Sequence, residues 1–242
     1  MKNQYVGDVG DFGKYGLLRF LIEGTNLKLG VNWYLTQDDG TNDGKYLQYL
    51  RDNHNSCDAE LLKCDSKLAE ILKKITHDGQ KNGTIREIER SGIFPSSTIY
   101  YNALLGEKVS HEKRDEWFKK SLEELKCDIV FADPDNGLSD TETSGKHMLY
   151  SEIKEYYKSG KSVIAYYHFD RTSEEERGHK LQEKSKLLGI ENYYGLRFHR
   201  YSARDYWIFA QPRHRDIIVE RISAFVKSKW CNDGYGHFSR VQ

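Results

Sequence analysis

Two acids and an amide directly follow a short apolar run in the middle of the chain. The run Ile-Val-Phe-Ala at 129–132 predicts a buried strand, and Pro134 and Gly137 of the next segment end it. In open α/β sheets, ligands bind just beyond the carboxyl ends of the strands. Asp133, Asp135 and Asn136 are therefore predicted catalytic residues, with a solvated acidic turn as the alternative. The two carboxylates would repel each other unless a metal ion, a ligand amine or a basic side chain lies between them.

A glycine-rich segment with charged residues stands near the start of the sequence. Three glycines alternate with two aspartates and Lys14 between residues 7 and 14, just before a helix predicted from residue 13. Glycine lets the backbone approach a ligand closely, and free N–H groups at a helix start favour an anion. Gly13 and Lys14 are therefore predicted ligand-binding residues. The alternative is a capped helix start with flexible glycines, and the spacing differs from the dinucleotide-binding motif Gly-x-Gly-x-x-Gly.

An acidic loop follows the first predicted strand. The strand covers 29–36, and the loop at 36–45 contains Thr36, Asp38, Asp39 and Asn42. The loop resembles a calcium-binding loop only in composition, because no Glu stands at the position which that pattern requires. The alternative to a ligand-binding loop is an ordinary acidic turn.

The predicted strand at 162–168 also ends in polar residues. His168 is followed closely by Asp170 and Arg171. His168 suits a general base, a metal ligand or a hydrogen-bond donor, and a purely structural histidine is the alternative. We expect Arg171 to contribute to substrate binding.

These strand ends are predicted to converge on one pocket, since parallel strands bring their carboxyl ends to the same edge of a sheet. Oxygen ligands with one imidazole suit Mg²⁺ or Mn²⁺. One hypothesis is therefore a metal site made of Asp39, Asp133, Asp135 and His168.

Basic and aromatic residues alternate between residues 197 and 204, on a predicted hairpin. Arg197 and Arg200 are predicted to contact phosphates, beside rings on which bases stack. The alternative is a solvated hairpin face.

The order of the predicted elements indicates the fold class. Strands are predicted at 29–36, 98–102, 128–132, 162–168, 193–201 and 205–211. Helices are predicted at 13–24, 44–52, 58–76, 83–91, 110–125, 147–158, 173–188 and 213–229. Alternating helices and strands predict a doubly wound, mostly parallel α/β sheet with helices on both faces and an antiparallel C-terminal hairpin. We expect a single domain over 1–242 with a helical insertion at about 52–95.

Composition narrows the class of protein. The 242 residues carry 37 Lys and Arg against 37 Asp and Glu, so no global positive field draws in nucleic acid. No apolar run reaches the ~18 residues of a membrane span, which predicts no membrane partner. The four cysteines form no Cys-x-x-Cys pair, so neither a zinc site nor a disulfide framework is predicted, and reduced thiols indicate a cytoplasmic location. The aromatic tail at 230–238 is expected either to fold back or to mediate self-association.

Two segments resemble motifs of a known enzyme family. Phe12-Gly-Lys-Tyr with the following Leu17-Leu resembles the N-terminal Gly-Lys motif of DNA adenine methyltransferases and of a ribosomal-RNA adenine methyltransferase family. Asp133-Pro resembles the start of their Asp-Pro-Pro-Tyr catalytic motif. The chain also resembles a bacterial protein family that shares its N-terminal motif and Asp-Pro-Asp-Asn-Gly-Leu at 133–138.

The resemblance implies a methyltransferase-like Rossmann fold and S-adenosylmethionine as cofactor. Gly13, Lys14, Thr36 and Asp39 would hold the cofactor, and Asp133 with Asn136 would face the amine to be methylated. Asp135 and Asn136 replace the second proline and the aromatic residue of the motif. The loop at 36–45 replaces the usual glycine-rich cofactor loop.

Three functions follow from these patterns. The first is an enzyme acting on nucleic acid or a nucleotide, as a divergent S-adenosylmethionine-dependent methyltransferase. The second is a Mg²⁺-dependent phosphoesterase or nuclease that uses the same acidic strand ends. The third is a non-catalytic partner protein with a methyltransferase-like fold.

Overall fold

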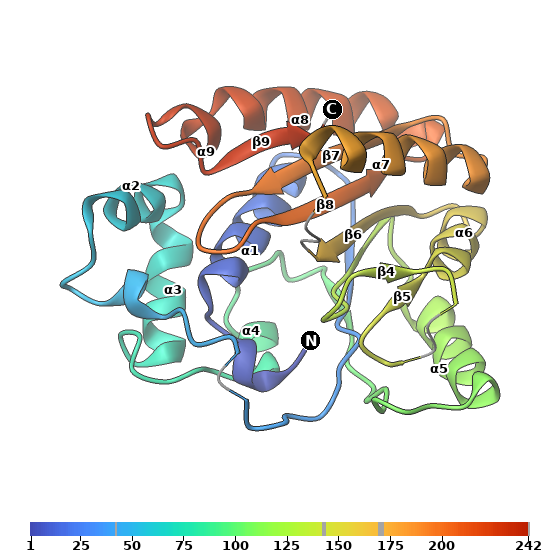
Figure 1. The fold of residues 1–242 in the computed structure, drawn as a ribbon, viewed down its shortest axis with the longest axis horizontal. Coiled ribbons are helices and arrows are strands. Elements are labelled where there is room, and N and C mark those ends of the chain that lie inside the picture. Colours follow the sequence, from blue (N-terminus) through green and yellow to red (C-terminus); the bar gives the residue numbers. More distant parts are fainter. Residues whose placement is uncertain (42, 142–143, 169–171, 242) are drawn as a thin grey trace.

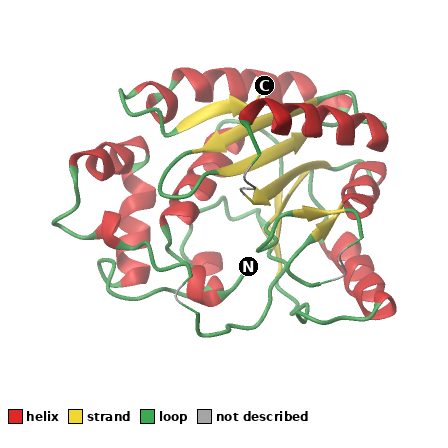
Figure 2. Ribbon diagram, viewed as in Figure 1, coloured by secondary structure: helices red, strands yellow, loops and turns green. Residues whose placement is uncertain are grey.

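A seven-stranded sheet forms the centre of the computed structural model, which describes residues 1–41, 43–141, 144–168 and 172–241 (Figures 1 and 2). The strand order is β2-β1-β3-β6-β8-β7-β9, and β2, β1, β3 and β6 run parallel. The strands are β1 (Leu29–Asn32), β2 (Ile99–Tyr101), β3 (Ile129–Ala132), β6 (Ser162–His168), β7 (Tyr193–Phe198), β8 (Arg204–Phe209) and β9 (Phe238–Val241). The prediction of an α/β fold with a mostly parallel sheet is confirmed.

The chain changes direction across the sheet after β1. It passes from β1 to β2 on one side and then crosses back to β3 on the other side of β1. Such a reversal leaves a crevice beyond the carboxyl ends of the two strands, where α/β proteins bind ligands. The switch point of this sheet therefore lies between the residues that follow β1 and those that follow β3.

Apolar residues on both faces of the sheet build two cores. Ile129 and Phe131 of β3 pack on one face, and Val130 and Ala132 pack on the other. The first core includes α1 (Val9–Ile22), α3 (Ser66–Thr76) and α8 (Arg215–Lys227), and the second includes α5 (His111–Glu124), α6 (Tyr150–Lys158) and α7 (Glu174–Leu188). A strand covered on both faces needs apolar side chains at every position, which explains the unbroken apolar run of β3.

The first helix begins earlier than residue 13. Asp8 caps it by accepting a hydrogen bond from the backbone N–H of Gly10 at 2.9 Å. The prediction that the glycines precede the helix is therefore right for Gly7 and wrong for Gly10 and Gly13, which lie inside α1. A Cβ on Gly13 would lie 2.8 Å from the ring of Phe198, and one on Gly16 would lie 2.2 Å from the Trp230 ring. These glycines let α1 pack closely against neighbouring aromatic rings.

Three helices stand between β1 and β2, within the range predicted as a helical insertion (Figure 1). They are α2 (Ser56–Cys64), α3 and α4 (Ile85–Arg90). One continuous helix at 58–76 was expected, and this is wrong because Asp65 ends α2 and caps α3. Its side chain accepts a hydrogen bond from Leu68 N at 2.9 Å and pairs with Arg19 at 2.6 Å.

Most of the other differences between the predicted and the observed elements involve short elements. The helix predicted at 44–52 is reduced to a single 3-10 turn, Gln48–Leu50, and further 3-10 turns cover Asn3–Tyr5 and Pro212–His214. The helix expected from 147 starts at Tyr150, because Met148–Leu149 form β5, which pairs with β4 (Leu138–Ser139).

The C-terminal segment folds back onto the sheet. Residues after the short helix α9 (Lys229–Asn232) form β9, which pairs antiparallel with β7. The predicted β7–β8 hairpin is confirmed, but β8 lies inside the sheet beside β6, and β9 forms the edge.

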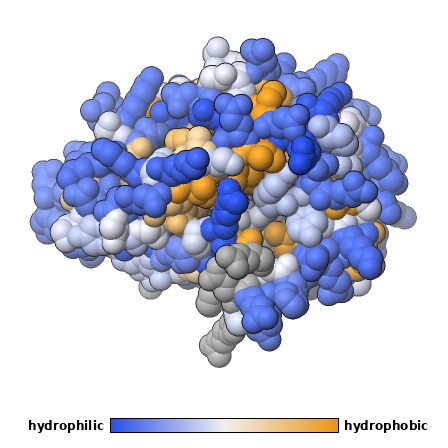
Figure 3. All heavy atoms as spheres, turned by 90° about the horizontal axis from the view of Figure 1, so that it is seen from above, coloured by the Kyte–Doolittle hydropathy of each residue, from blue (hydrophilic) through white to orange (hydrophobic). Residues whose placement is uncertain are grey.

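Most of the surface seen from above is hydrophilic, with apolar residues gathered in the middle of this face (Figure 3). None of the helices in the part of the chain that the structure describes combines the length and the apolar character needed to cross a bilayer.

Candidate functional site

A cavity of about 440 Å³ opens beyond the carboxyl ends of β3 and β6. Its walls come from the start of α1, residues 133–136, the end of β6 and the hairpin residues Ser202 and Arg204. Small-molecule sites commonly measure about 300–1,000 Å³. Five of the predicted residues line the cavity: Lys14, Asp133, Asp135, Asn136 and His168.

Lys14 joins the two motif segments at the floor of the cavity. Its Nζ lies 2.6 Å from Asp133 Oδ2 and 2.7 Å from Asp11 Oδ1, and all three residues are about 95% buried. Burial disfavours the ammonium, but the two carboxylates more than offset this, so the pKa of Lys14 is raised. Burial also raises the pKa of Asp133, and Lys14 offsets only part of that rise.

Asp135 pairs with a different cation. Its Oδ1 lies 2.5 Å from the α-amino nitrogen of Met1, and its Oδ2 accepts a hydrogen bond from Thr36 Oγ1 at 3.1 Å. The same Met1 nitrogen donates to the backbone carbonyls of Tyr34 at 3.0 Å and Asp133 at 3.1 Å. The two acids of the Asp-Pro-Asp segment are thus each neutralised by a separate nitrogen cation.

The carbonyl of Tyr34 is held in place by an unusual backbone conformation. Tyr34 has a φ of 45°, a left-handed value that costs a non-glycine residue about 1–3 kcal/mol. The ring is buried, and its hydroxyl donates to Glu152 Oε2 at 3.0 Å. Glu152 in turn pairs with the buried Arg114 at 2.8 Å. This network holds Tyr34, the second residue after β1, so that its carbonyl oxygen accepts a hydrogen bond from the Met1 amine.

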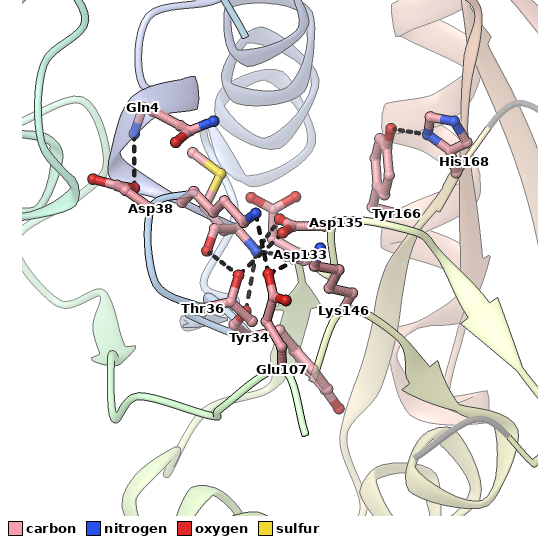
Figure 4. A network of polar contacts seen from close by, with 12 residues as sticks. Gln4, Tyr34, Thr36, Asp38, Glu107, Asp133, Asp135, Lys146, Tyr166 and His168 are labelled. Atoms are coloured by element: carbon pink, nitrogen blue, oxygen red, sulfur yellow. Dashed lines mark hydrogen bonds and ion pairs between the residues drawn. The ribbon is translucent and has the colours of Figure 1, made fainter. Parts of the chain in front are cut away.

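Asp39 lies outside the cavity, in the loop that follows β1. Its carboxylate pairs with Lys2 and accepts hydrogen bonds from Gln4 Nε2 at 2.9 Å and from Thr41 Oγ1 at 2.8 Å. The hydrogen bond from Lys2 is the main reason that the pKa of Asp39 is lowered. The neighbouring Asp38 accepts the backbone N–H of Gln4 (Figure 4). The loop therefore holds the N-terminal residues in place and does not contribute Asp39 to the cavity.

Asp8 and Arg204 also line the cavity and were not predicted as site residues. Arg204 Nη2 lies 3.1 Å from Asp8 Oδ1, and the other Asp8 oxygen accepts the backbone N–H of Tyr46 at 3.0 Å. Asp8 stands in the N-terminal motif, so the sequence offered a signal for it. Arg204 is 196 positions after Asp8 in the chain, and only the tertiary structure brings it to the cavity.

His168 and Tyr166 lie at the end of β6, apart from the acidic cluster (Figure 4). The Tyr166 hydroxyl and His168 Nδ1 are 3.1 Å apart. His168 is exposed, whereas burial raises the pKa of Tyr166 to about 12. His168 is thus accessible to a ligand at the cavity mouth.

A glycine holds the Asp-Pro-Asp-Asn turn against β6. Gly137 has a φ of 81°, and a Cβ there would lie 2.6 Å from the backbone nitrogen of His168. Asn136 is exposed, and its backbone N–H donates to the carbonyl of Lys146 at 2.8 Å. The amide side chain of Asn136 is therefore directed by a tight turn next to β6.

The remaining predicted residues lie elsewhere. Arg197 is buried and forms a bidentate pair with Asp205 at 2.7 and 2.9 Å, and Arg200 pairs with Asp58 of α2 at 2.7 Å. Neither arginine lines the cavity, and Gly13 lies against Phe198. Asn42, Asp170 and Arg171 lie outside the described residues.

The proposed metal ligands do not come together within the described residues. No three of Asp39, Asp133, Asp135 and His168 bring their ligand atoms within 4.8 Å of one another. The group that meets this criterion is a different one, Cys64, Asp233 and His237.

Carboxylates outnumber cations around the cavity. Among its described lining residues, five aspartates face the side chains of Lys14 and Arg204 and the Met1 amine; the aspartates are Asp8, Asp11, Asp43, Asp133 and Asp135. Such a site favours a cationic or amine-bearing ligand over an anion.

No protein-family model matches the chain, and no curated protein matches it in sequence. The function is therefore inferred from the geometry of the site.

Proposed function

We propose that the protein is an S-adenosylmethionine-dependent methyltransferase that acts on an exocyclic amine of a nucleotide or nucleic acid. The observation that carries this proposal is the 2.6 Å contact between Lys14 and Asp133. These residues belong to the two segments that resemble adenine methyltransferase motifs, and they meet at the switch point of the sheet. Ligands bind at this position in α/β folds.

The charge around the cavity supports a cationic cofactor. S-adenosylmethionine supplies an electrophilic methyl group on a positively charged sulfur, and its amino-acid end carries an ammonium. Five aspartates suit such a ligand. The acceptors around the Met1 nitrogen, two backbone carbonyls and Asp135, are those that an α-ammonium requires. A cofactor that uses them has to displace this nitrogen.

Asp133 is the residue proposed to hold the target amine. Its carboxylate accepts hydrogen bonds when ionised, and Lys14 orients it from one side. Tyr5, Tyr46 and Tyr166 line the same cavity and are the rings proposed to stack on a base. Exposed Asn136 and His168 stand at its mouth, in reach of a larger substrate.

A metal-dependent nuclease is less well supported. Asp133 and Asp135 already have nitrogen partners at 2.6 and 2.5 Å, so neither requires a cation to relieve repulsion. A phosphodiester would also enter a cavity with an excess of carboxylates.

Calorimetry with S-adenosylmethionine and S-adenosylhomocysteine tests the cofactor. We expect binding to the native chain, to Asp133→Asn and to the matched control Asp216→Asn, whose side chain is 92% exposed on α8. Transfer of labelled methyl groups to single-stranded oligonucleotides and free nucleotides then tests the reaction. Asp133→Asn should lose transfer by about 10²–10⁴-fold, and Asp216→Asn should retain it.

Two outcomes separate the rival functions. Absence of heat at millimolar ligand with the folded native chain overturns the methyltransferase proposal. Binding without transfer to any nucleotide or oligonucleotide indicates the non-catalytic partner protein, which co-purification would reveal as a stable complex.

A further inference from the structure

We propose that Cys64, Asp233 and His237 form a binding site for Zn²⁺ or a similar borderline-soft divalent metal, separate from the cavity. Cys64 is the last residue of α2, and the other two follow α9 in the C-terminal segment. One ligand atom from each residue lies within 4.8 Å of the other two. None of the three lines the cavity.

The donor set selects the class of metal. A thiolate, an imidazole and a carboxylate are all ligands that Zn²⁺ accepts in proteins. Mg²⁺ and Ca²⁺ prefer oxygen ligands and bind thiolates poorly. Three protein ligands also leave a fourth tetrahedral position for water or another side chain.

Three polar atoms of this group lack hydrogen-bond partners in the described part of the chain, whereas the Cys64 thiol donates to the carbonyl of Glu60 at 3.6 Å. His237 is fully buried, and neither of its ring nitrogens has a hydrogen-bond partner among the described residues. Asp233 Oδ2 also lacks a hydrogen-bond partner among these residues, although it lies 2.6 Å from His237 Nε2. The two atoms are therefore close without the alignment of a hydrogen bond. Buried polar atoms nearly always have partners, and a shared metal ion would satisfy Asp233 Oδ2 and one ring nitrogen of His237 at once.

The other oxygen of Asp233 is held in place by the backbone. Asp233 Oδ1 accepts hydrogen bonds from Tyr235 N at 2.9 Å and Gly236 N at 3.0 Å. Such contacts orient the carboxylates that ligate metals and leave the second oxygen available. Metal–ligand bonds of about 2.0–2.3 Å place tetrahedral ligands roughly 3.3–3.7 Å apart. Binding therefore requires the 2.6 Å contact between Asp233 and His237 to widen.

Two further cysteines stand on the same pair of helices. Cys57 is in α2 and Cys231 is in α9, and these helices pack against each other. Cys231 is a candidate for the fourth position. The remaining cysteine, Cys127, lies before β3 and serves as a control.

The site would fasten the C-terminal segment to the helical insertion. Asp58 of α2 pairs with Arg200 of the β7–β8 hairpin at 2.7 Å, and Arg204 of the same hairpin lines the cavity. A metal on Cys64 thus stabilises the helix that supports one wall of the cavity, whichever reaction takes place there.

Metal analysis of the full chain tests the site. Protein purified without chelators should retain about one Zn²⁺ per chain, and Cys64→Ser should bind Zn²⁺ more than ~10-fold more weakly in competition with a chromophoric chelator. Cys127→Ser should match the native chain, and Cys231→Ser identifies the fourth ligand. Cys64 is only partly buried, so its serine variant is expected to fold.

Absorption spectra of the Co²⁺-loaded chain report the ligand set directly. Native chain loaded with Co²⁺ should show visible bands of a tetrahedral site and a near-ultraviolet charge-transfer band from the thiolate, and Cys64→Ser should weaken the latter. The proposal is overturned if the folded native chain binds neither Zn²⁺ nor Co²⁺. Equal affinities of Cys64→Ser and Cys127→Ser would overturn it as well.

Discussion

Lys14 Nζ and Asp133 Oδ2 lie 2.6 Å apart, although 118 residues separate them in the chain. Their contact connects the first turns of α1 to the loop after β3. Asp11 shares the same ammonium at 2.7 Å. Two buried carboxylates thus depend on one cation, and this dependence makes the site testable by substitution.

Removing the ammonium should destabilise the fold. Lys14→Met leaves Asp11 and Asp133 buried without their common cation, and breaking a buried pair costs about 3–5 kcal/mol. Urea unfolding should show this loss. Adding Asp133→Asn to Lys14→Met should restore part of the stability, because it removes one of the unpaired charges. Additive effects of the two changes would contradict the coupling.

Methyl transfer should depend on the ionisation of Asp133. The pKa of this carboxyl is raised because it is buried, and its ionised form is the stronger acceptor for the proposed target amine. Activity should therefore increase with pH, with an apparent pKa above the ordinary aspartate value of 3.8. The pH profile of kcat/KM checks this, and an acid limb at or below 3.8 would exclude Asp133 as the titrating group.

Acidification should weaken the fold through His214. Its Nε2 accepts a hydrogen bond from Arg213 Nε at 3.0 Å, and its Nδ1 lies 2.9 Å from Ser162 Oγ, so the ring is neutral. Burial, with repulsion from Arg213, lowers the pKa of His214 below 6.5. The unfolded chain then binds a proton at a higher pH than the folded chain does. The stability from this group is complete above about pH 6.5 and is lost as the pH falls through the lowered value.

The variant His214→Gln isolates this contribution. Its free energy of unfolding should vary less between about pH 7 and 5 than that of the native chain. Identical pH dependences in the two proteins would show that another group is responsible.

A methyl group on Gly13 should disturb the packing of α1. The new Cβ would lie 2.8 Å from the Phe198 ring, so Gly13→Ala should lower stability by about 1–3 kcal/mol. Gly106→Ala is the matched control, since the nearest atom to its Cβ is 3.7 Å away. Thermal unfolding of both variants measures the packing role of Gly13, and calorimetry with S-adenosylmethionine measures any direct role in ligand binding.

Arg200 should affect stability more than ligand affinity. Arg200→Ala leaves the carboxylate of Asp58, whose side chain is 2% exposed, without its cation. A hydrogen bond to a charged group contributes about 1.5–3 kcal/mol, and we expect a loss of this size in chemical unfolding. Cofactor affinity in calorimetry should stay within about twofold of the native value. A large loss of affinity at unchanged stability would restore Arg200 as a ligand-binding residue.

Local sequence was sufficient for the order of the long strands and for the chemistry of the strand ends. Every long strand predicted from an apolar run is present, because a strand covered on both faces must be apolar along its length. Asp133, Asp135 and His168 line one cavity because parallel strands end at a common edge. Helix ends were harder to predict, since Asp8 and Asp65 act as caps through side-chain contacts that periodicity does not reveal.

Only the tertiary structure decided which charges meet. The sequence by itself required a positive group near Asp133 and Asp135, because like charges cannot be buried together, but Lys14 and the Met1 amine were indistinguishable from other cations. Likewise, Arg197 and Arg200 look like phosphate contacts until the fold pairs them with Asp205 and Asp58. Charge pairing acts over a few ångströms in space, whereas the sequence records only distance along the chain.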